Sequence, residues 1–217
     1  MDKFKSMTEL KELTKEGKDW EIEFENRSSM VTILAIHGGG IEPATTELAY
    51  TIAHRGNYNY FSFKGMRREG NNELHVTSTH YDDQIALDLV RGSQRTVAIH
   101  GCEGNESVAY IGGSDDRLIE LITESLEDIG ISVREAPHHI SGTQENNIVN
   151  MTQTQGGVQL ELTAQLRKEL FKNRKSSRKN RENKDNWDDL MYDFADAMKK
   201  AIAVSYTHLR AHETDSY

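Results

Sequence analysis

Two histidines stand at the ends of two matching apolar runs. The tetrapeptide Ala-Ile-His-Gly occurs at residues 35–38 and again at 98–101, and each copy closes a run that predicts a buried strand. After the first copy the chain continues Gly-Gly-Ile-Glu, so Glu42 follows His37 within one glycine-rich turn. Two imidazoles and one carboxylate can hold a hydrolytic zinc ion and leave a fourth position for water. His37, Glu42 and His100 are therefore candidate ligands of one zinc ion.

Other interpretations of these residues exist. A histidine at a strand end is commonly a hydrogen-bonded rim residue with no ligand, and the spacing alone leaves that open. A triple glycine can cradle a phosphate, but neither a GxGxxG pattern nor a P-loop lysine follows it. The His-Gly-Gly-Gly run also resembles an esterase oxyanion motif, but the chain has no Gly-x-Ser-x-Gly nucleophile elbow.

Glu161 is the candidate general base. It lies in the alternating segment 158–162, whose leucines share one face and leave Gln159, Glu161 and Thr163 on the other. A carboxyl between Leu160 and Leu162 is partly desolvated, which raises its pKa toward the range useful for proton transfer. The alternative is an ordinary exposed carboxylate on a strand.

The sequence gives weaker indications that further histidines and one cysteine belong to the site. His75 and His80 flank residues 76–79, which belong to a strand expected at 74–79. Either histidine is a group near the site or a polar rim residue. The pair at 138–139 is expected on the surface because adjacent side chains point apart. Cys102 has no evident activating base and is expected to be a buried small hydrophobe.

Composition narrows the class of protein. The chain has 217 residues, enough for one domain with a substantial core, and a formal net charge of −9. Its single cysteine excludes an internal disulfide and a cysteine-rich metal site. No apolar stretch is long enough for a membrane span, and residues 1–5 lack the apolar core of a signal peptide. We expect a protein that is cytoplasmic as synthesised, with no membrane partner, and released by host lysis if a phage encodes it.

Residues 204–217 do not fit the pattern of the rest of the chain. Residues 204–214 resemble the translation of a transposon-type sequencing adapter, and they interrupt a helical pattern without a cap or turn signal. We therefore expect a single domain over 1–203 and a non-native tail over 204–217. The histidines at 208 and 212 are accordingly not metal candidates.

The order of elements predicts an α/β fold. Strands are expected at 21–24, 31–36, 58–63, 74–79, 96–99, 108–111, 131–135 and 158–162, and helices at 6–16, 45–53, 82–90, 115–129, 164–171 and 187–202. Strands that alternate with helices indicate a mixed, mostly parallel sheet flanked by helices. The polar segment 141–157 is expected to be a functional loop or disordered.

Several ordered motifs together resemble the poly-γ-glutamate hydrolases of bacteriophages and their bacterial relatives. They are residues 35–42, 74–80 (LHVTSTH), 99–102 (IHGC), 110–113 (YIGG), 146–150 (NNIVN) and 157–163 (GVQLELT). The resemblance covers roughly residues 31–170. It implies a zinc-carboxypeptidase-like α/β core in which His37, Glu42 and His100 hold one zinc ion and Glu161 is the general base.

The chain departs from the family pattern at two places. Residues 80–84 read His-Tyr-Asp-Asp-Gln, where an acidic residue followed by proline is expected, and Met151 follows Asn150 where arginine is expected. Another basic side chain must then bind a substrate carboxylate. As substrate-binding residues we expect Arg67, His80, Asn147, Asn150 and Arg167.

The function implied is zinc-dependent hydrolysis of γ-glutamyl amide bonds in an anionic polymer. One rival is a zinc amidohydrolase that acts on short γ-glutamyl or N-acyl-glutamate compounds. Another is a non-catalytic phage protein that binds nucleic acid through the basic stretch 167–184, but the acidic total and the matched histidines favour an enzyme with no nucleic-acid partner. The basic stretch can instead attract a polyanionic substrate or be a solvated surface.

Overall fold

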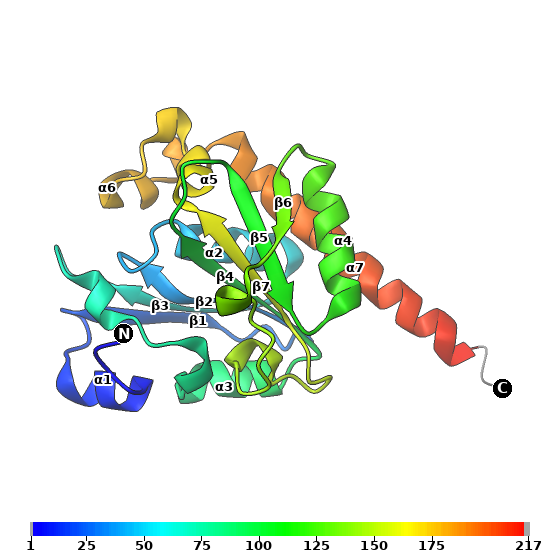
Figure 1. The fold of residues 1–217 in the computed structure, drawn as a ribbon, viewed down its shortest axis with the longest axis horizontal. Helices are drawn as coiled ribbons and strands as arrows, with labels where there is room; N and C mark the ends of the chain where they lie inside the picture. The colour runs from blue at the N-terminus through cyan, green and yellow to red at the C-terminus, as the bar shows by residue number, and fades with distance from the viewer. Residues whose placement is uncertain (1, 215–217) are drawn as a thin grey trace.

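A single twisted sheet of seven strands forms the centre of the computed structural model, which describes the backbone of residues 2–214 and the side chains of residues 2–206 (Figure 1). In spatial order the strands are β1 (Trp20–Glu25), β3 (Asn59–Gly65), β2 (Val31–Gly39), β4 (Arg95–Cys102), β7 (Val158–Thr163), β5 (Val108–Gly113) and β6 (Ser132–Glu135). The two strands that end in Ala-Ile-His-Gly, β2 and β4, are direct neighbours.

The sheet is mixed and mostly parallel, as predicted. The pairs β3–β2, β2–β4, β4–β7 and β5–β6 are parallel, whereas β1–β3 and β7–β5 are antiparallel. Because β2, β4 and β7 run in the same direction, their carboxyl ends meet at one edge of the sheet. This edge brings together the strands that carry the candidate site residues.

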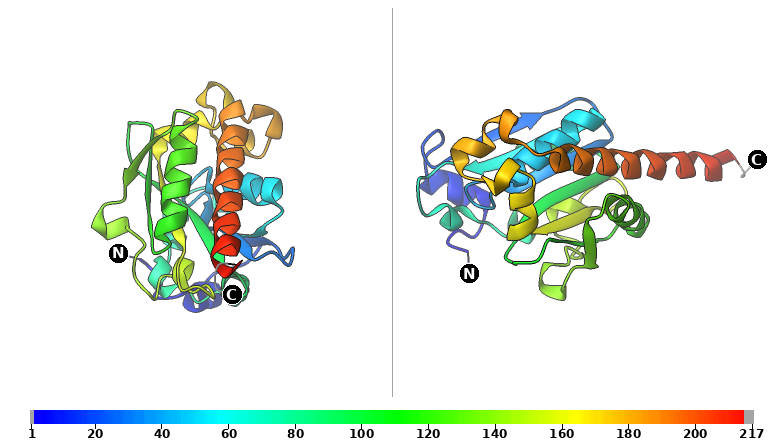
Figure 2. Two further views of the ribbon diagram at one scale, coloured as in Figure 1. Left: turned by 90° about the vertical axis from the view of Figure 1, so that its right-hand side faces the viewer. Right: turned by 90° about the horizontal axis from the view of Figure 1, so that it is seen from above.

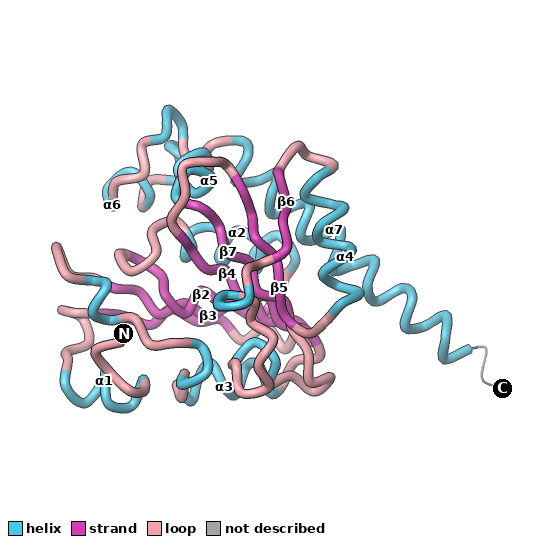
Figure 3. The backbone as a smooth tube through the Cα atoms, viewed as in Figure 1, coloured by secondary structure: helices cyan, strands magenta, loops and turns pink. Residues whose placement is uncertain are grey.

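Helices cover both faces of the sheet (Figures 2 and 3). Helices α2 (Thr45–Gly56), α4 (Asp116–Glu127) and α7 (Asp189–Thr214) pack on one face around Leu48, Leu118 and Phe194. Helices α1 (Met7–Leu13) and α3 (Gln84–Arg91) pack on the other around Leu10 and Val90. The short helices are α5 (Ala164–Glu169), α6 (Arg178–Arg181) and the 3-10 turns Asn71–Leu74, Ser78–His80, His138–Ile140, Ile148–Asn150, Lys172–Arg174 and Lys184–Asn186.

Both faces of the central strands are therefore buried. Every residue of β2 and of β7 is shielded from solvent, which explains why residues 31–36 form one continuous run of apolar and β-branched side chains. The predicted strands at 21–24, 31–36, 58–63, 96–99, 108–111, 131–135 and 158–162 are all present within one to three residues of their expected bounds.

The prediction of a strand at 74–79 is wrong. This segment instead crosses the sheet edge as two 3-10 turns joined by extended residues around Val76. Leu74 and Val76 are fully buried in the core on the α1 and α3 side, so the alternation of the sequence arises from burial without strand pairing. Alternating hydrophobicity alone does not distinguish these two arrangements.

The carboxyl-terminal helix differs from the sequence expectation as well. Helix α7 continues through the adapter-like residues to Thr214, and its final turns project beyond the rest of the molecule (Figure 1). Ser205 is buried, and the Tyr206 hydroxyl donates to the Met30 carbonyl at 3.2 Å. The side chains of residues 207–217, including both histidines of this tail, lie outside the described part, and the non-native origin of the tail stays a prediction.

None of the described helices combines the length and the apolar character that crossing a membrane requires.

Candidate metal centre and catalytic site

Three candidate donors converge at the carboxyl edge of the sheet. His37 Nδ1 lies 3.1 Å from Glu42 Oε1 and 3.1 Å from His100 Nδ1, and His100 Nδ1 lies 3.7 Å from Glu42 Oε2. Each histidine is 2% exposed. The structure thus brings together the three residues that the sequence predicts as ligands, and all of their donor atoms lie within 4.8 Å of one another.

The spacing of these donors fits a tetrahedral zinc ion. Two ligands about 2.0–2.1 Å from one ion at a tetrahedral angle are separated by about 3.3–3.4 Å. The two Nδ1 atoms are 3.1 Å apart, close to this value, and Glu42 approaches His37 through Oε1 at 3.1 Å and His100 through Oε2 at 3.7 Å. His37 Nε2 donates to the Val76 carbonyl at 2.8 Å, which leaves the Nδ1 lone pair facing the other donors. The donor set and its orientation therefore suit a divalent ion with a preference for nitrogen and carboxylate ligands.

The electrostatic field at the centre favours a cation. Burial alone would lower the pKa of His37, but the charge and hydrogen bond of Glu42 outweigh burial, so the net pKa is raised. Burial likewise opposes ionisation of Glu42, but His37 lowers its pKa to about 2. Burial lowers the pKa of His100 to about 3, and its Nε2 is buried without a hydrogen-bond partner. Glu42 is thus ionised at neutral pH, which suits a ligand of a cation.

The glycines around the centre allow this close convergence. Gly101 donates its N–H to Glu42 Oε2 at 2.8 Å, which orients the carboxylate. A Cβ atom at Gly101 would lie 2.7 Å from Arg167 Cζ, so a larger residue would push the guanidinium away. Gly39 has φ +64 and lies against the backbone of Gly65, which makes the turn after His37 possible.

Glu161 lies beside this centre on β7. Its position is in register with His100 on the neighbouring strand β4, and the side chain is 7% exposed. Burial raises the pKa of Glu161 to about 8, and the negative charge of Glu42 adds to this effect. A carboxyl with this pKa can both accept and return a proton near neutral pH.

A chain of amides orients Glu161. Gln159 Nε2 donates to Glu161 Oε1 at 3.0 Å, and Gln159 Oε1 accepts from Asn147 Nδ2 at 3.1 Å. The sequence places Gln159 and Glu161 on the same face of the strand, but the part played by Gln159 was not predicted. Asn147, predicted to bind substrate, lies 3% exposed at the far end of this chain. A direct role of Asn147 in substrate binding stays a prediction.

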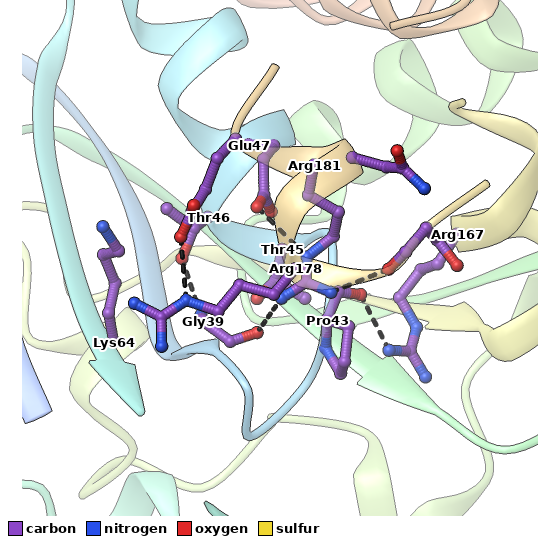
Figure 4. Close-up of polar contacts among 12 residues, drawn as sticks. Gly39, Pro43, Thr45, Thr46, Glu47, Lys64, Arg167, Arg178 and Arg181 are labelled. Carbon is purple, nitrogen blue, oxygen red and sulfur yellow. Dashed lines mark hydrogen bonds and ion pairs between the residues drawn. The ribbon is translucent and has the colours of Figure 1, made fainter. Parts of the chain in front are cut away.

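Arg167 links the three segments that carry the site. Its guanidinium donates to the Pro43 carbonyl at 2.9 Å (Figure 4). It also donates to the carbonyls of Cys102 at 3.0 Å and Leu162 at 3.1 Å. Each of these residues lies one or two positions from Glu42, His100 or Glu161. Arg167 therefore fixes the relative positions of the candidate ligands and base. The guanidinium has five N–H groups, so further donors remain beyond these three bonds.

Asp2 and His75 form a second layer behind His37; a position of His75 near the site was one of its two interpretations from the sequence, whereas Asp2 was not predicted. The ring of His75 lies against that of His37, with centroids 3.9 Å apart. His75 Nδ1 is 2.7 Å from Asp2 Oδ1, and Asp2 Oδ2 accepts from the Thr77 N–H at 2.6 Å. Asp2 thereby holds the segment whose Val76 carbonyl orients His37. A contact across 73 residues leaves no local sequence signal.

This arrangement predicts an effect of Asp2 on metal affinity. Asp2→Asn is expected to weaken zinc binding roughly 10-fold, because groups that orient a metal ligand typically contribute 10- to 100-fold. Competition with a chromophoric chelator measures the affinity. Asp82→Asn is the matched control, since Asp82 also anchors the amino-terminal segment, through Thr8, without contacting residues 75–77. Equal affinities of the two variants would contradict the role of Asp2.

Two other predicted substrate residues lie apart from the metal candidates. Arg67 forms ion pairs with Asp19 at 2.7 Å and Glu73 at 3.1 Å, so its charge is engaged. His80 is exposed and lines a cavity of about 820 Å³ together with Thr77 and Met151. Substrate contact by either residue stays a prediction.

Asn150 organises the polar loop between β6 and β7. Its side chain donates to the carbonyls of Gly142 at 2.8 Å and Gln144 at 2.9 Å and accepts from the Gly157 N–H at 3.1 Å. The loop predicted at 141–157 is therefore internally bonded and includes one 3-10 turn. A contact of Asn150 with substrate is untested and stays a prediction.

Removal of the Asn150 amide is expected to destabilise the fold. Asn150→Ala leaves the Gly142 carbonyl and the Gly157 N–H without partners among the described residues, whereas the Gln144 carbonyl still accepts from the Asn147 N–H. The substitution should lower the free energy of unfolding by about 2–4 kcal/mol. Urea denaturation followed by circular dichroism measures this change. Asn146→Ala removes a single exposed 3.3 Å bond to the Thr79 carbonyl and serves as the control. A difference of less than ~0.5 kcal/mol between the two variants would contradict this role.

Cys102 carries no sign of a nucleophile. Burial raises the pKa of its thiol to about 11, which keeps it protonated, and its sulfur contacts the Glu161 carbonyl at 3.8 Å.

The chain is similar to known proteins over most of its length. The family model described as poly-gamma-glutamate hydrolase matches residues 4–197. Among curated proteins of Bacillus subtilis, the SPbeta prophage-derived protein YoqZ is 37% identical over 78% of this chain and 62% of its own length. YmaC is 30% identical over 87% of this chain and 79% of its own length. The match thus spans about three fifths of YoqZ.

Two solved structures share the fold closely. The bacteriophage poly-gamma-glutamate hydrolase superposes with a TM-score of 0.91 at 31% identity, covering 95% of this chain and 99% of that one. The zinc-free apo form of YndL superposes with a TM-score of 0.88 at 30% identity, covering 95% of this chain and all of that one. By the extent of these matches, the chain belongs to the poly-γ-glutamate hydrolase family.

Proposed function

We propose that this protein is a zinc-dependent hydrolase that cleaves the γ-glutamyl amide bonds of poly-γ-glutamate. The observation that carries the proposal is the convergence of His37, Glu42 and His100 next to a buried carboxyl of raised pKa. Family membership supports the reaction class, and the relative solved in a form called zinc-free supports the choice of metal.

His37, Glu42 and His100 would hold the ion, and Arg167 keeps the segments that carry them in place. Zinc bound by these residues would supply a Lewis acid that lowers the pKa of water and polarises a carbonyl. Glu161 takes the proton of the attacking water and returns it to the leaving amine nitrogen as the C–N bond breaks. Gln159 holds the Glu161 carboxyl in one orientation during both transfers.

Developing negative charge on the substrate requires a cation. Arg167 is the guanidinium closest in sequence to Glu161, and its charge interacts with both Glu42 and Glu161. We propose that its remaining N–H donors stabilise the carbonyl oxygen of the scissile amide or a nearby substrate carboxylate. Three backbone bonds fix the guanidinium, so it does not need to reorganise during the reaction.

A direct assay tests the proposal. Purified protein loaded with zinc is incubated with poly-γ-glutamate, and newly formed amino groups and chain length are measured. Hydrolysis that stops on removal of the metal by a chelator and returns with zinc is the expected result. No hydrolysis of polymer, together with turnover of short γ-glutamyl or N-acyl-glutamate compounds, would favour the amidohydrolase alternative. DNA binding without hydrolysis of either substrate would overturn the assignment as a hydrolase.

A further inference from the structure

The basic stretch of residues 167–184 is largely exposed, but Arg181 within it is buried. Part of it folds over the start of α2 and encloses a cavity of about 260 Å³ beside the turn at Gly39 and Gly40. Arg181 anchors this wall, since its guanidinium donates to the Gly39 carbonyl at 3.0 Å and the side chain is almost fully buried. The cavity therefore begins two residues after the candidate ligand His37.

Four cationic side chains line the cavity: Lys64, Arg178, Arg181 and Lys184. Figure 4 shows Lys64, Arg178 and Arg181 gathered around the turn, with Arg167 beyond Pro43. Carboxylates of the protein already pair with three of the four. Lys64 contacts Glu21 and Glu23 at 2.6 Å, and the two arginines contact Glu182 at 2.8 Å and Glu47 at 3.2 Å.

Lys184 is the exception. No acidic partner of Lys184 occurs in the part of the chain that the structure describes. Its Nζ instead lies 4.5 Å from the ring centroid of Tyr50 and 5.6 Å from that of Trp187. Both aromatic residues line the same cavity. The rings hold the ammonium at the cavity while leaving its charge uncompensated.

These features define the chemistry of a ligand. An ammonium without an acidic partner can bind an anion, and the apolar atoms of Tyr50, Met66 and Trp187 that line the cavity can contact short methylene groups. The carboxylates in the lining, Glu23, Glu47 and Glu182, are already paired with the other three cations. The cavity is smaller than the roughly 300–1,000 Å³ typical of sites for larger ligands. A γ-linked glutamyl unit combines an anion with short methylene groups. Its γ-carboxyl forms the amide, and its α-carboxylate stays free next to a chain of two methylenes.

We propose that this cavity is a substrate subsite that binds the free α-carboxylate of one glutamyl unit, with Lys184 as its charged contact. The inference rests on the proposed function and adds the position at which the polymer is recognised. Since the cavity adjoins the turn between His37 and Glu42, a chain bound at the metal centre can place a flanking unit there.

Kinetics give the first test. Lys184→Met keeps the aliphatic stem and removes the charge, so we expect the KM for poly-γ-glutamate to rise about 10-fold with kcat and zinc content little changed. Lys184→Arg should restore most of the affinity. The control is Lys200→Met on α7. It breaks an exposed ion pair between Lys200 and Asp128 and should leave KM unchanged. An unchanged KM in Lys184→Met, while the parent protein hydrolyses the polymer, would overturn the subsite and leave the proposed function intact.

A binding experiment separates the subsite from catalysis. Calorimetry in the Glu161→Gln background compares a γ-linked diglutamate with the same compound in which the α-carboxylates are carboxamides. In the protein with Lys184, the amidated ligand should bind about 10-fold more weakly than the acid. In the Lys184→Met protein, the two ligands should bind with equal, weak affinity. An equal loss in both proteins, or no binding of either ligand, would refute the assignment, whether or not the polymer is hydrolysed.

Discussion

Glu161→Gln is expected to retain zinc at the level of the parent protein and to lose hydrolysis of poly-γ-glutamate by about 10²- to 10⁴-fold, the usual contribution of a general acid–base group. Gln has nearly the same shape as Glu and can still accept the hydrogen bond of Gln159, so the fold and the metal ligands should be preserved. It cannot accept a proton from water. Initial rates and elemental analysis of the same preparation measure both quantities.

A matched substitution shows that the effect is specific to this position. Glu106→Gln changes an exposed glutamate that pairs with Arg134 at 2.9 Å, and it should leave the rate unchanged. If Glu161→Gln retains more than about a tenth of the parent rate, Glu161 is not the proton acceptor.

Alanine at each candidate ligand is expected to abolish stoichiometric metal. His37→Ala, Glu42→Ala and His100→Ala each leave two donors where a hydrolytic zinc site has three, and bound zinc should fall from about one equivalent to a small fraction. Hydrolysis should fall with it. Elemental analysis after dialysis against a weak chelator measures the metal, and circular dichroism monitors the fold.

The surface histidine His139 provides the control for these variants. It is exposed in the 3-10 turn His138–Ile140, so His139→Ala should keep both zinc and activity. For Glu42, a second variant guards against misfolding, because Glu42→Gln keeps an oxygen to accept the Gly101 N–H. Full zinc occupancy in any folded ligand variant would remove that residue from the site.

The sequence was sufficient for the parts of the site that depend on strand ends. His37 and His100 each close a buried parallel strand, and parallel neighbours bring such ends to one edge. Glu42 follows within a glycine turn, and Glu161 stands on a strand whose alternation fixes its face. In each case the position of the residue in the fold follows from local sequence pattern and from the general rule that parallel strands end at one edge of a sheet.

Contacts between distant segments were not predictable in this way. Asp2 reaches His75 across most of the amino-terminal half, and nothing near either residue encodes that encounter. Asn150 was predicted to bind substrate, which stays a prediction, but the bonds of its amide to three backbone groups of its own loop were not foreseen. A polar side chain in a long loop can form hydrogen bonds to the loop backbone or to a ligand, and composition does not distinguish the two.

The segment 74–79 illustrates a third limit. Leu74 and Val76 are buried on one side, as in a strand, but the chain at this point crosses the sheet edge without pairing. Its backbone is consequently available to side chains, and the Val76 carbonyl accepts from His37. The failed prediction therefore coincides with the segment that orients the candidate ligand His37.

The two outermost strands bear on how the molecule behaves at high concentration. Strand β1 carries Glu21, Glu23 and Glu25 in alternation, and β6 is four residues long and includes Arg134 and Glu135. A second molecule aligning its own β1 against this one would bring two sets of three glutamates together, and the cations paired with each set, Lys64 and Arg27, offset only part of that charge. The sheet thus resists growth by addition of further chains, which disfavours fibrous self-association.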